Sequence, residues 1–167
     1  MTAQARARIV VQKDEHKFSC AHMTVFADGT KERLHGHNFH LGVAIELPAD
    51  DQFPMLDFAR VKAVLADLCA ELKEHLLLPA HCPLVKVLHH DDRELEISFC
   101  DRRYVMPSED ALLLPVDNIV VERLARYLWS RIRDGLQAEL QECGALELDV
   151  TVTESPGQGA TWSAPLP

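Results

Sequence analysis

The stretch HGHNFHLGVAIEL, residues 35–47, alternates apolar residues with small or polar ones over most of its length. Every second position from Phe39 to Leu47 is apolar, which is the period of a β-strand with one buried face. His35 and His37 have the same parity as these apolar positions, so both imidazoles extend that face beyond its N-terminal end. The stretch therefore predicts a half-buried strand that begins with two histidines on the same side.

The rest of the chain supplies the neighbours of this strand. A second strand is predicted upstream, because Phe18, Cys20 and His22 share one face by the same period. The predicted elements are strands over Ile9–His22, His35–Leu47 and Leu146–Val152, helices over Leu56–His75 and Val120–Gln141, a β-hairpin over Leu84–Phe99 with its turn at Asp91-Asp92, and a loose tail beyond Gly157 and Gly159. This order predicts an α+β fold in which two helices cover one face of a sheet.

The composition indicates one globular domain over residues 1–167. Of these residues 47% are apolar and 26% are charged, and the length fits a single domain of about 100–200 residues. No stretch approaches the roughly 18 uninterrupted apolar residues that a membrane helix needs. The formal net charge of −9 disfavours nucleic acid as a partner, because polyanion binding needs clustered Lys and Arg. No apolar segment follows the charged residues 1–8, so we expect a cytoplasmic protein that acts on a small molecule.

Three histidines are candidates for the ligands of one metal ion. Gly36, between His35 and His37, lets another group approach the backbone closely. Two imidazoles on one strand face suit two ligands of Zn²⁺, and His22, at the end of the neighbouring strand with matching parity, is the natural third. Three imidazoles plus one open position describe a catalytic rather than a structural zinc site. The alternative is a pair of exposed loop histidines without a metal.

Two further side chains interrupt apolar patterns. His75 is in line with the buried stripe of the first predicted helix, either as a structural histidine at the helix C-terminus or as a proton carrier whose ring Glu74 orients. Glu154 continues the even-numbered apolar face of the last strand, so a carboxylate points where the core is expected. A guanidine-like edge of a heterocycle would donate two hydrogen bonds to that carboxylate. The alternative is that the strand ends before Glu154.

Several short motifs together resemble those of one enzyme family. They are Phe18-Ser-Cys-Ala-His22, Leu34-His-Gly-His-Asn38, Leu56-Asp-Phe58, Leu114-Pro-Val and Thr153-Glu154, in this order over nearly the whole chain. Through them the chain resembles the 6-pyruvoyl-tetrahydropterin synthase family, which includes the 6-carboxytetrahydropterin synthases of queuosine synthesis. The resemblance implies a tunnelling fold (T-fold), in which antiparallel sheets with two helices on one face assemble as homo-trimers or homo-hexamers around a barrel.

The resemblance also implies roles for individual residues. They are Zn²⁺ ligands at His22, His35 and His37, a proton-relay histidine at His75 preceded by Glu74 in place of the usual Asp, and a pterin-anchoring carboxylate at Glu154 beside Thr153. The implied substrate is a reduced pterin of the 7,8-dihydroneopterin triphosphate type. The Thr that commonly begins the second helix is replaced here by Ile119-Val120-Val121.

The family's catalytic cysteine, a few residues before the HGH motif, is missing, and Lys31 or Glu32 stands in its place. Glu32 is similar to the glutamate of a variant subgroup, which has Glu in place of Cys and yields 6-hydroxymethyl-dihydropterin for folate synthesis. An ammonium beside Zn²⁺ is repelled and is a poor base while protonated. Glu32 is therefore the predicted catalytic base, and Cys20, on the strand face of His22, is its rival. The alternative is that Glu32 is a solvated loop charge without a catalytic role.

These residues together predict a zinc-dependent lyase that converts a reduced pterin. The predicted reaction is side-chain elimination or carbon–carbon cleavage, with a 6-pyruvoyl-, 6-carboxy- or 6-hydroxymethyl-pterin product. The alternative is a non-catalytic protein on the same fold that holds a pterin- or purine-like heterocycle through Glu154.

Overall fold

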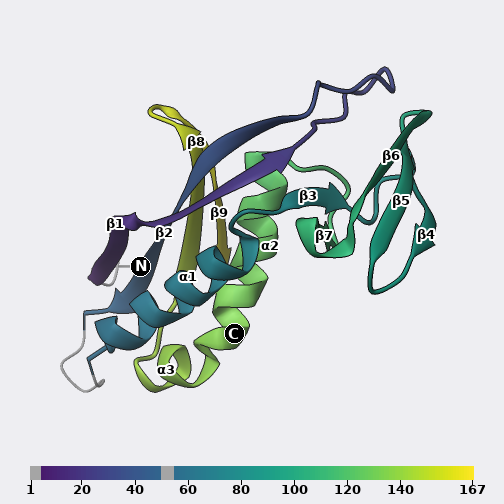
Figure 1. Ribbon diagram of the computed structural model, residues 1–167. Helices are drawn as coiled ribbons and strands as arrows, with labels where there is room; N and C mark the ends of the chain where they lie inside the picture. The colour runs from purple at the N-terminus through teal and green to yellow at the C-terminus, as the bar shows by residue number, and fades with distance from the viewer. Residues whose placement is uncertain (1–4, 50–54) are drawn as a thin grey trace.

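The structure, a computed structural model, describes residues 5–49 and 55–167. Along the chain these residues form β1 (Arg6–His22), β2 (His35–Pro48), α1 (Phe58–Leu72), β3 (Leu76–Pro79), β4 (Val85–His90), β5 (Glu94–Phe99), β6 (Arg102–Pro107), the 3₁₀ helix η1 (Ser108–Asp110), β7 (Ala111–Leu114), α2 (Val121–Gly135), α3 (Gln137–Glu142), β8 (Glu147–Ser155) and β9 (Gln158–Pro165). Six strands form a sheet in the order β7-β3-β1-β2-β8-β9, and β4-β5-β6 form a smaller one. Figure 1 shows α1 and α2 against one face of the larger sheet, which confirms the predicted α+β fold.

The two longest strands, β1 and β2, form the centre of the larger sheet. They pair antiparallel from Arg6 opposite Pro48 to His22 opposite His35, with one irregularity between Gln12 and Lys17. β8 and β9 continue the antiparallel sheet on the far side of β2. β3 and β7 add two short parallel strands beyond β1. The prediction of an antiparallel sheet is thus confirmed for β1, β2, β8 and β9. It does not include the parallel strands β3 and β7 at the other edge.

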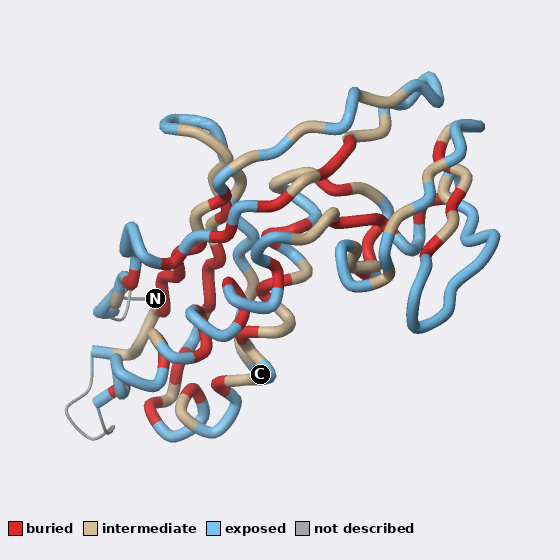
Figure 2. Tube along the Cα trace, viewed as in Figure 1, coloured by how far each residue is buried: buried red, intermediate tan, exposed pale blue. Residues whose placement is uncertain are grey.

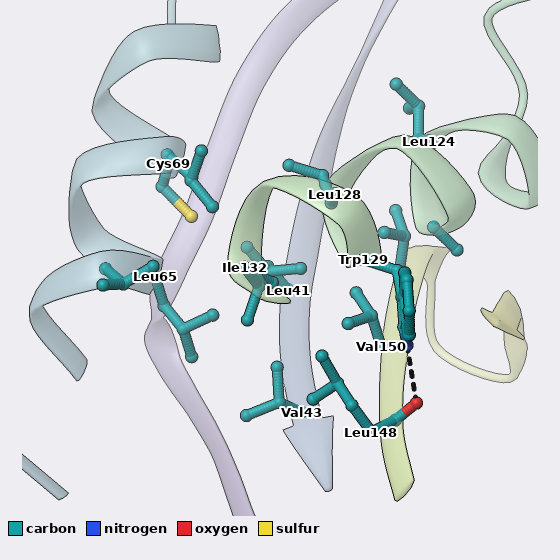
Figure 3. Close-up of a cluster of buried hydrophobic side chains, with 14 of the residues drawn as sticks. Leu41, Val43, Leu65, Cys69, Leu124, Leu128, Trp129, Ile132, Leu148 and Val150 are labelled. Carbon is teal, nitrogen blue, oxygen red and sulfur yellow. Dashed lines mark hydrogen bonds between the residues drawn. The ribbon is translucent and has the colours of Figure 1, made fainter. Parts of the chain in front are cut away.

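Alternation along the long strands builds the core under the helices. The helix-facing residues pair across β2 and β8 as Leu41 with Val152, Val43 with Val150 and Ile45 with Leu148. These residues are buried, and the middle of the sheet is coloured as buried in Figure 2. α1 packs onto this cluster with Leu65 and α2 with Leu128 and Ile132, which are spaced at helical intervals (Figure 3). Trp129 adds a polar anchor, because its indole Nε1 donates a hydrogen bond of 2.7 Å to the carbonyl oxygen of Leu148.

The first helix ends at Leu72, not at His75 as predicted. The chain leaves it at Glu74, whose φ of 63° is in the left-handed region. It then joins the sheet, since the Glu74 N–H donates to the Ser19 carbonyl at 2.7 Å and the His75 carbonyl accepts from the Ala21 N–H at 2.9 Å. An apolar run of three leucines, residues 76–78, fits both a helix stripe and a buried strand, so periodicity does not locate this boundary.

The C-terminal third also differs from the prediction at two points. The second helix is broken at Leu136, whose φ of −116° and ψ of 15° are not helical, so that α2 and α3 are separate. The tail after Gly157 is not loose: Gly157, with a φ of 82°, lies in the turn between β8 and β9, and these strands pair along their length. The prediction of a loose tail is wrong, because glycine here permits a tight turn rather than disorder.

The predicted hairpin over residues 84–99 is the first part of a three-stranded sheet. β6 follows β5 through Cys100 and Asp101, whose φ values of 47° and 58° are those of a tight hairpin turn. The inner face of this sheet forms a second small core, which contains Met23, Leu78, Leu95, Ile97 and Phe99. Met23 directly follows β1, so this core packs the smaller sheet against the connection between β1 and β2, the segment that leads to the histidines (Figure 1).

Candidate metal centre and active site

His22, His35 and His37 come together where β1 ends and β2 begins. Strand pairing sets His22 opposite His35 and Cys20 opposite His37, and alternation then places all three imidazoles on one side. One nitrogen of each ring lies within 4.8 Å of those of the other two. His22 is buried, whereas His35 and His37 are half-buried and accessible from solvent. The structure thus brings the three predicted ligands together with one open side.

Backbone carbonyls orient two of these rings. Nδ1 of His22 lies 3.1 Å from the Ile119 carbonyl oxygen, and Nδ1 of His35 lies 2.8 Å from that of Arg33. A carbonyl oxygen only accepts, so each Nδ1 carries the proton and each Nε2 presents a lone pair. Nε2 of His22 is buried and has no hydrogen-bond partner in the part of the chain that the structure describes. A metal ion satisfies a buried, unpartnered imidazole nitrogen beside two others, so these residues fit Zn²⁺.

Burial favours the neutral, ligating form of His22. Loss of solvation lowers the pKa of His22 below its ordinary value, against the raising effect of the bond to Ile119, and the neighbouring imidazoles lower it further. The ring of Phe39, itself fully buried, lies 5.5 Å from the His22 ring and 5.7 Å from that of His37, centre to centre. The imidazoles of His22 and His37 therefore pack against an apolar ring, and this burial favours uncharged His22 at neutral pH.

Sequence reasoning missed the residues that support this arrangement. Asn118 ties the segment after β1 to the segment before α2: its Oδ1 accepts from the Val25 N–H at 3.0 Å and its Nδ2 donates to the Val25 carbonyl at 2.8 Å. The same segment supplies the carbonyl of Ile119. Every residue has a backbone carbonyl, so the sequence does not indicate which one orients a ring. An Asn shortly before a helix is typical of an N-cap, which conceals its role here. Gly36 behaves as expected, since a Cβ there would lie 3.2 Å from the Cys20 carbonyl oxygen.

Glu32 faces the histidines and Lys31 faces away from them. Oε2 of Glu32 lies 3.8 Å from Nε2 of His35, and the Glu32 side chain is 37% exposed. The Lys31 Nζ lies instead over the rings of Phe99 and Tyr104. Of the two residues in place of the cysteine that the resemblance implies, Glu32 is therefore the one whose side chain lies beside the histidines.

Cys20 shares the strand face of His22, but its thiol is poorly suited to act as a base. It is 6% exposed, and burial raises the pKa of Cys20 to about 12. A thiol with such a pKa stays protonated at neutral pH, whereas the thiolate is the reactive form. Burial therefore disfavours the thiolate form of Cys20.

His75 lies beside β1, close to the metal-site end of that strand. Its carbonyl accepts from Ala21, the residue before His22, and its half-buried ring has no hydrogen-bond partner at Nδ1 within the described ranges. Glu74 does not orient this ring, because its carboxylate is 75% exposed and pairs with the Lys73 Nζ at 3.0 Å. The left-handed backbone at Glu74, where the chain turns from helix into sheet, accounts for the difference from the prediction.

Thr153 and Glu154 lie near the end of β8, on the strand next to the histidines. Thr153 pairs with His40, three residues along β2 from His37, which is roughly 10 Å at about 3.4 Å per residue. The strand continues through Glu154 to Ser155, so it does not end before the carboxylate. Pairing with β9 is irregular between Thr153 and Ser155, which makes the half-buried Glu154 the extra residue of a bulge.

Comparison with known proteins places the chain in a family. The profile of the family described as 6-pyruvoyl tetrahydropterin synthase matches residues 11–165. The chain belongs to this family. A protein of Methanocaldococcus jannaschii that is provisionally named 6-carboxy-5,6,7,8-tetrahydropterin synthase is 32% identical over 148 residues, which cover 87% of this chain and 88% of that protein.

Solved structures of the 6-pyruvoyl tetrahydropterin synthase family share this fold. The Plasmodium vivax enzyme is 24% identical and superimposes with a TM-score of 0.88, covering 97% of this chain and 99% of that one. A form of it described as a catalytic-residue mutant, in which a glutamate is replaced by alanine, gives a TM-score of 0.86 at the same identity and coverage. The resemblance inferred from the motifs is confirmed, and membership assigns the chain to the pterin synthases. Within residues 5–49 and 55–167, no helix combines the length and apolar character needed to cross a membrane.

Proposed function

We propose that the chain is a zinc-dependent lyase that acts on the side chain of a reduced pterin such as 7,8-dihydroneopterin triphosphate. The observation that carries this proposal is the group of three imidazoles with the Glu32 carboxylate 3.8 Å from His35. Membership of the pterin synthase family supplies the substrate class.

The proposed chemistry divides proton transfer between two residues. His22, His35 and His37 would hold the ion and leave one position open for the substrate. When bound, the ion supplies Lewis acidity to a hydroxyl or keto oxygen, which acidifies the neighbouring C–H. Glu32 removes the proton from that carbon or hydroxyl, and His75 carries a proton to or from the side chain. Loss of triphosphate followed by tautomerisation gives a 6-pyruvoyl product. Cleavage of the C1′–C2′ bond with protonation of C1′ gives a 6-hydroxymethyl product and a two-carbon aldehyde that keeps the triphosphate. Loss of both triphosphate and a two-carbon aldehyde, with addition of water, gives a 6-carboxy product.

A glutamate base has a counterpart in a relative. In the Plasmodium vivax enzyme a glutamate is described as a catalytic residue. In this chain the Glu32 carboxylate lies beside the histidines, and Glu32 is one of the two residues, with Lys31, that stand where the resemblance implies a cysteine. A carboxylate is attracted to a metal cation and remains able to accept a proton from an acidified C–H, which supports Glu32 in this role.

In this proposal the substrate lies between the metal centre and Glu154. The carboxylate accepts two hydrogen bonds from the guanidine-like edge of the pterin, with Thr153 beside it. Thr153 lies opposite His40, and Glu154 is one residue nearer to the histidine end of β2, so the anchor stands within roughly 10 Å of His37 along the sheet, a distance that a bicyclic ring can bridge. We also propose that the chain assembles as a homo-trimer or homo-hexamer, since β9 is an unpaired edge of the larger sheet as far as the structure describes it. We further propose that it works in the cytoplasm.

Incubation with 7,8-dihydroneopterin triphosphate tests the proposed function directly. We expect the zinc-loaded protein to consume the substrate, and mass spectrometry then identifies which of the three products forms. A thermal shift on adding the pterin, without any product, would indicate the non-catalytic binding protein instead.

Replacement of Glu154 by Gln tests the anchoring role. Glu154→Gln keeps the size but removes the charge and turns one acceptor into a donor. Because charge-assisted hydrogen bonds contribute roughly 1.5–3 kcal/mol each, pterin affinity should fall at least about tenfold. Isothermal calorimetry measures the affinity, and zinc content should not change. Glu147→Gln, at the other end of β8, is the control, and unaltered pterin binding by Glu154→Gln would eliminate the anchoring role.

A further inference from the structure

Lys31 connects the smaller sheet to the loop that carries Glu32. Its Nζ lies 5.3 Å from the centre of the Tyr104 ring on β6 and 5.7 Å from that of the Phe99 ring on β5. The same nitrogen lies 3.2 Å from Sδ of Met23. Met23 and Phe99 are fully buried and belong to the second core. A half-buried ammonium between two ring faces is attracted to their π electrons, and the attraction grows as the cation loses water.

The backbone of Glu32 is fixed from both sides. Its N–H donates to the Thr24 carbonyl at 2.9 Å, and its carbonyl accepts from the Lys31 Nζ at 3.0 Å. Val25 and Lys31 form an isolated antiparallel bridge, which holds the two limbs of the β1–β2 connection together. Glu32 is three residues before His35, so these contacts determine where its carboxylate stands relative to the imidazoles.

We propose that Lys31 is a positioning residue for Glu32. Held in the cage of Phe99 and Tyr104, it fixes the Glu32 backbone and thereby the distance between the Glu32 carboxylate and the histidines. The three-stranded sheet thus braces the loop that carries the proposed base. This inference rests on the proposed function, because that function gives Glu32 its proton-transfer role.

Other roles for Lys31 fit its contacts less well. A base or a substrate-binding cation would have to point toward the histidines, whereas Nζ is directed into the second core. A solvated surface lysine would make few contacts, as Lys86 does on the outer face of the same sheet, where it is exposed opposite Ser98. Lys31 instead combines two ring contacts with a hydrogen bond to the backbone of the neighbouring residue.

Substitution of Lys31 by Met tests the proposal through turnover. Lys31→Met keeps most of the side-chain length and removes the charge and the donors. We expect kcat to fall roughly tenfold, because a misplaced catalytic group loses rate steeply within about 1 Å. KM for the pterin and zinc content should not change. Lys31→Arg, which keeps a cation that stacks on rings, should recover most of kcat, and Lys86→Met should match the wild type.

A double-variant cycle separates positioning from general stabilisation. Because Lys31 acts through Glu32, Lys31→Met should have no further effect on kcat once Glu32 is already replaced by Gln. A tenfold loss in both backgrounds would overturn the proposal. A wild-type kcat in Lys31→Met would overturn it as well.

Amide hydrogen exchange gives a readout that does not depend on turnover. Exchange of the Glu32 N–H in the zinc-loaded protein should be at least about tenfold faster in Lys31→Met, and unchanged in Lys86→Met, because local opening exposes that amide. Unchanged exchange at Glu32 would overturn the positioning role. If the wild-type protein turns over no pterin, the proposed function fails, and the exchange rates then decide alone whether Lys31 positions Glu32.

Discussion

The variant His37→Ala is expected to be purified with little zinc, whereas the wild-type protein carries about one ion per chain. Removal of one of three imidazoles leaves two nitrogens, too few to hold an ion that keeps an open position for substrate. Turnover should fall by at least about 100-fold when the metal is lost, because the substrate C–H is then no longer acidified by the ion. His37 suits this test because its side chain is half-buried, so its removal leaves a smaller void than removal of the buried His22 would.

Elemental analysis of dialysed protein measures the metal content, and His40→Ala is the matched control. His40 is a half-buried histidine on the same strand, but its parity places it on the opposite face from His37. His40→Ala should therefore keep its zinc. Zinc contents of His35→Ala and His37→Ala that equal the wild-type value would show that the ion is bound elsewhere or not at all.

Zinc should be released as the pH falls, because the buried His22 binds the metal only in its neutral form. Imidazole must be neutral to bind a metal, and burial lowers the pKa of His22 below its ordinary value of about 6.5. The unfolded chain therefore binds this proton more readily than the folded one, so the metal-free protein loses stability as the pH falls below about 6.5. Zinc content should decrease over the same range as protons compete for the ring nitrogens.

The grouping of the three histidines could be predicted because it follows from strand alternation. His22 lies at the end of one strand, and His35 and His37 share parity at the start of the next, so antiparallel pairing is enough to bring the three rings together. What holds the rings could not be predicted. The carbonyls of Ile119 and Arg33 are backbone groups, and nothing in their side chains marks them.

The boundaries of the fold were harder to predict than its class. Residues 76–78 are three leucines, which prolong the apolar stripe of α1 equally well as a helix or as β3. Only their strand pairing, which is long-range in sequence, decides between the two: Leu76 pairs with Ala21 of β1, and all three leucines pair with β7. For the same reason the sequence predicts His75 at a helix end, whereas it lies directly before β3. Strand β9 is not predicted from the sequence, because Gly157 and Gly159 fit a loose tail as well as a hairpin turn followed by a strand.

At Glu154, parity along the strand is no longer sufficient to predict where the side chain points. The even-numbered face of β8 is buried as far as Val152, as the pattern predicts. The bulge then adds one residue at Glu154, and a bulge redirects side chains locally in a way that an unbroken period of two does not describe. Bulges are common beside active sites, which fits a carboxylate that serves a ligand rather than the core.

Glu32→Gln is expected to cut turnover by about 100-fold or more, within the range for general acid–base groups. The amide is nearly the same size as the carboxylate and leaves the backbone contacts of residue 32 intact, but it does not accept a proton at neutral pH. Zinc content and pterin binding should stay at the wild-type level, because Glu32 is neither one of the three proposed nitrogen ligands nor the proposed pterin anchor. Saturating kcat, elemental analysis and calorimetry measure the three quantities separately.

Cys20→Ala is the comparison that decides between the two candidate bases. Because burial raises the pKa of Cys20 to about 12, its thiol is protonated at neutral pH, and we expect the variant to keep most of its turnover. The loss of one buried sulfur should lower only the free energy of unfolding, by about 1 kcal/mol. Loss of activity in Cys20→Ala together with full activity in Glu32→Gln would assign the base to the cysteine and end the case for Glu32.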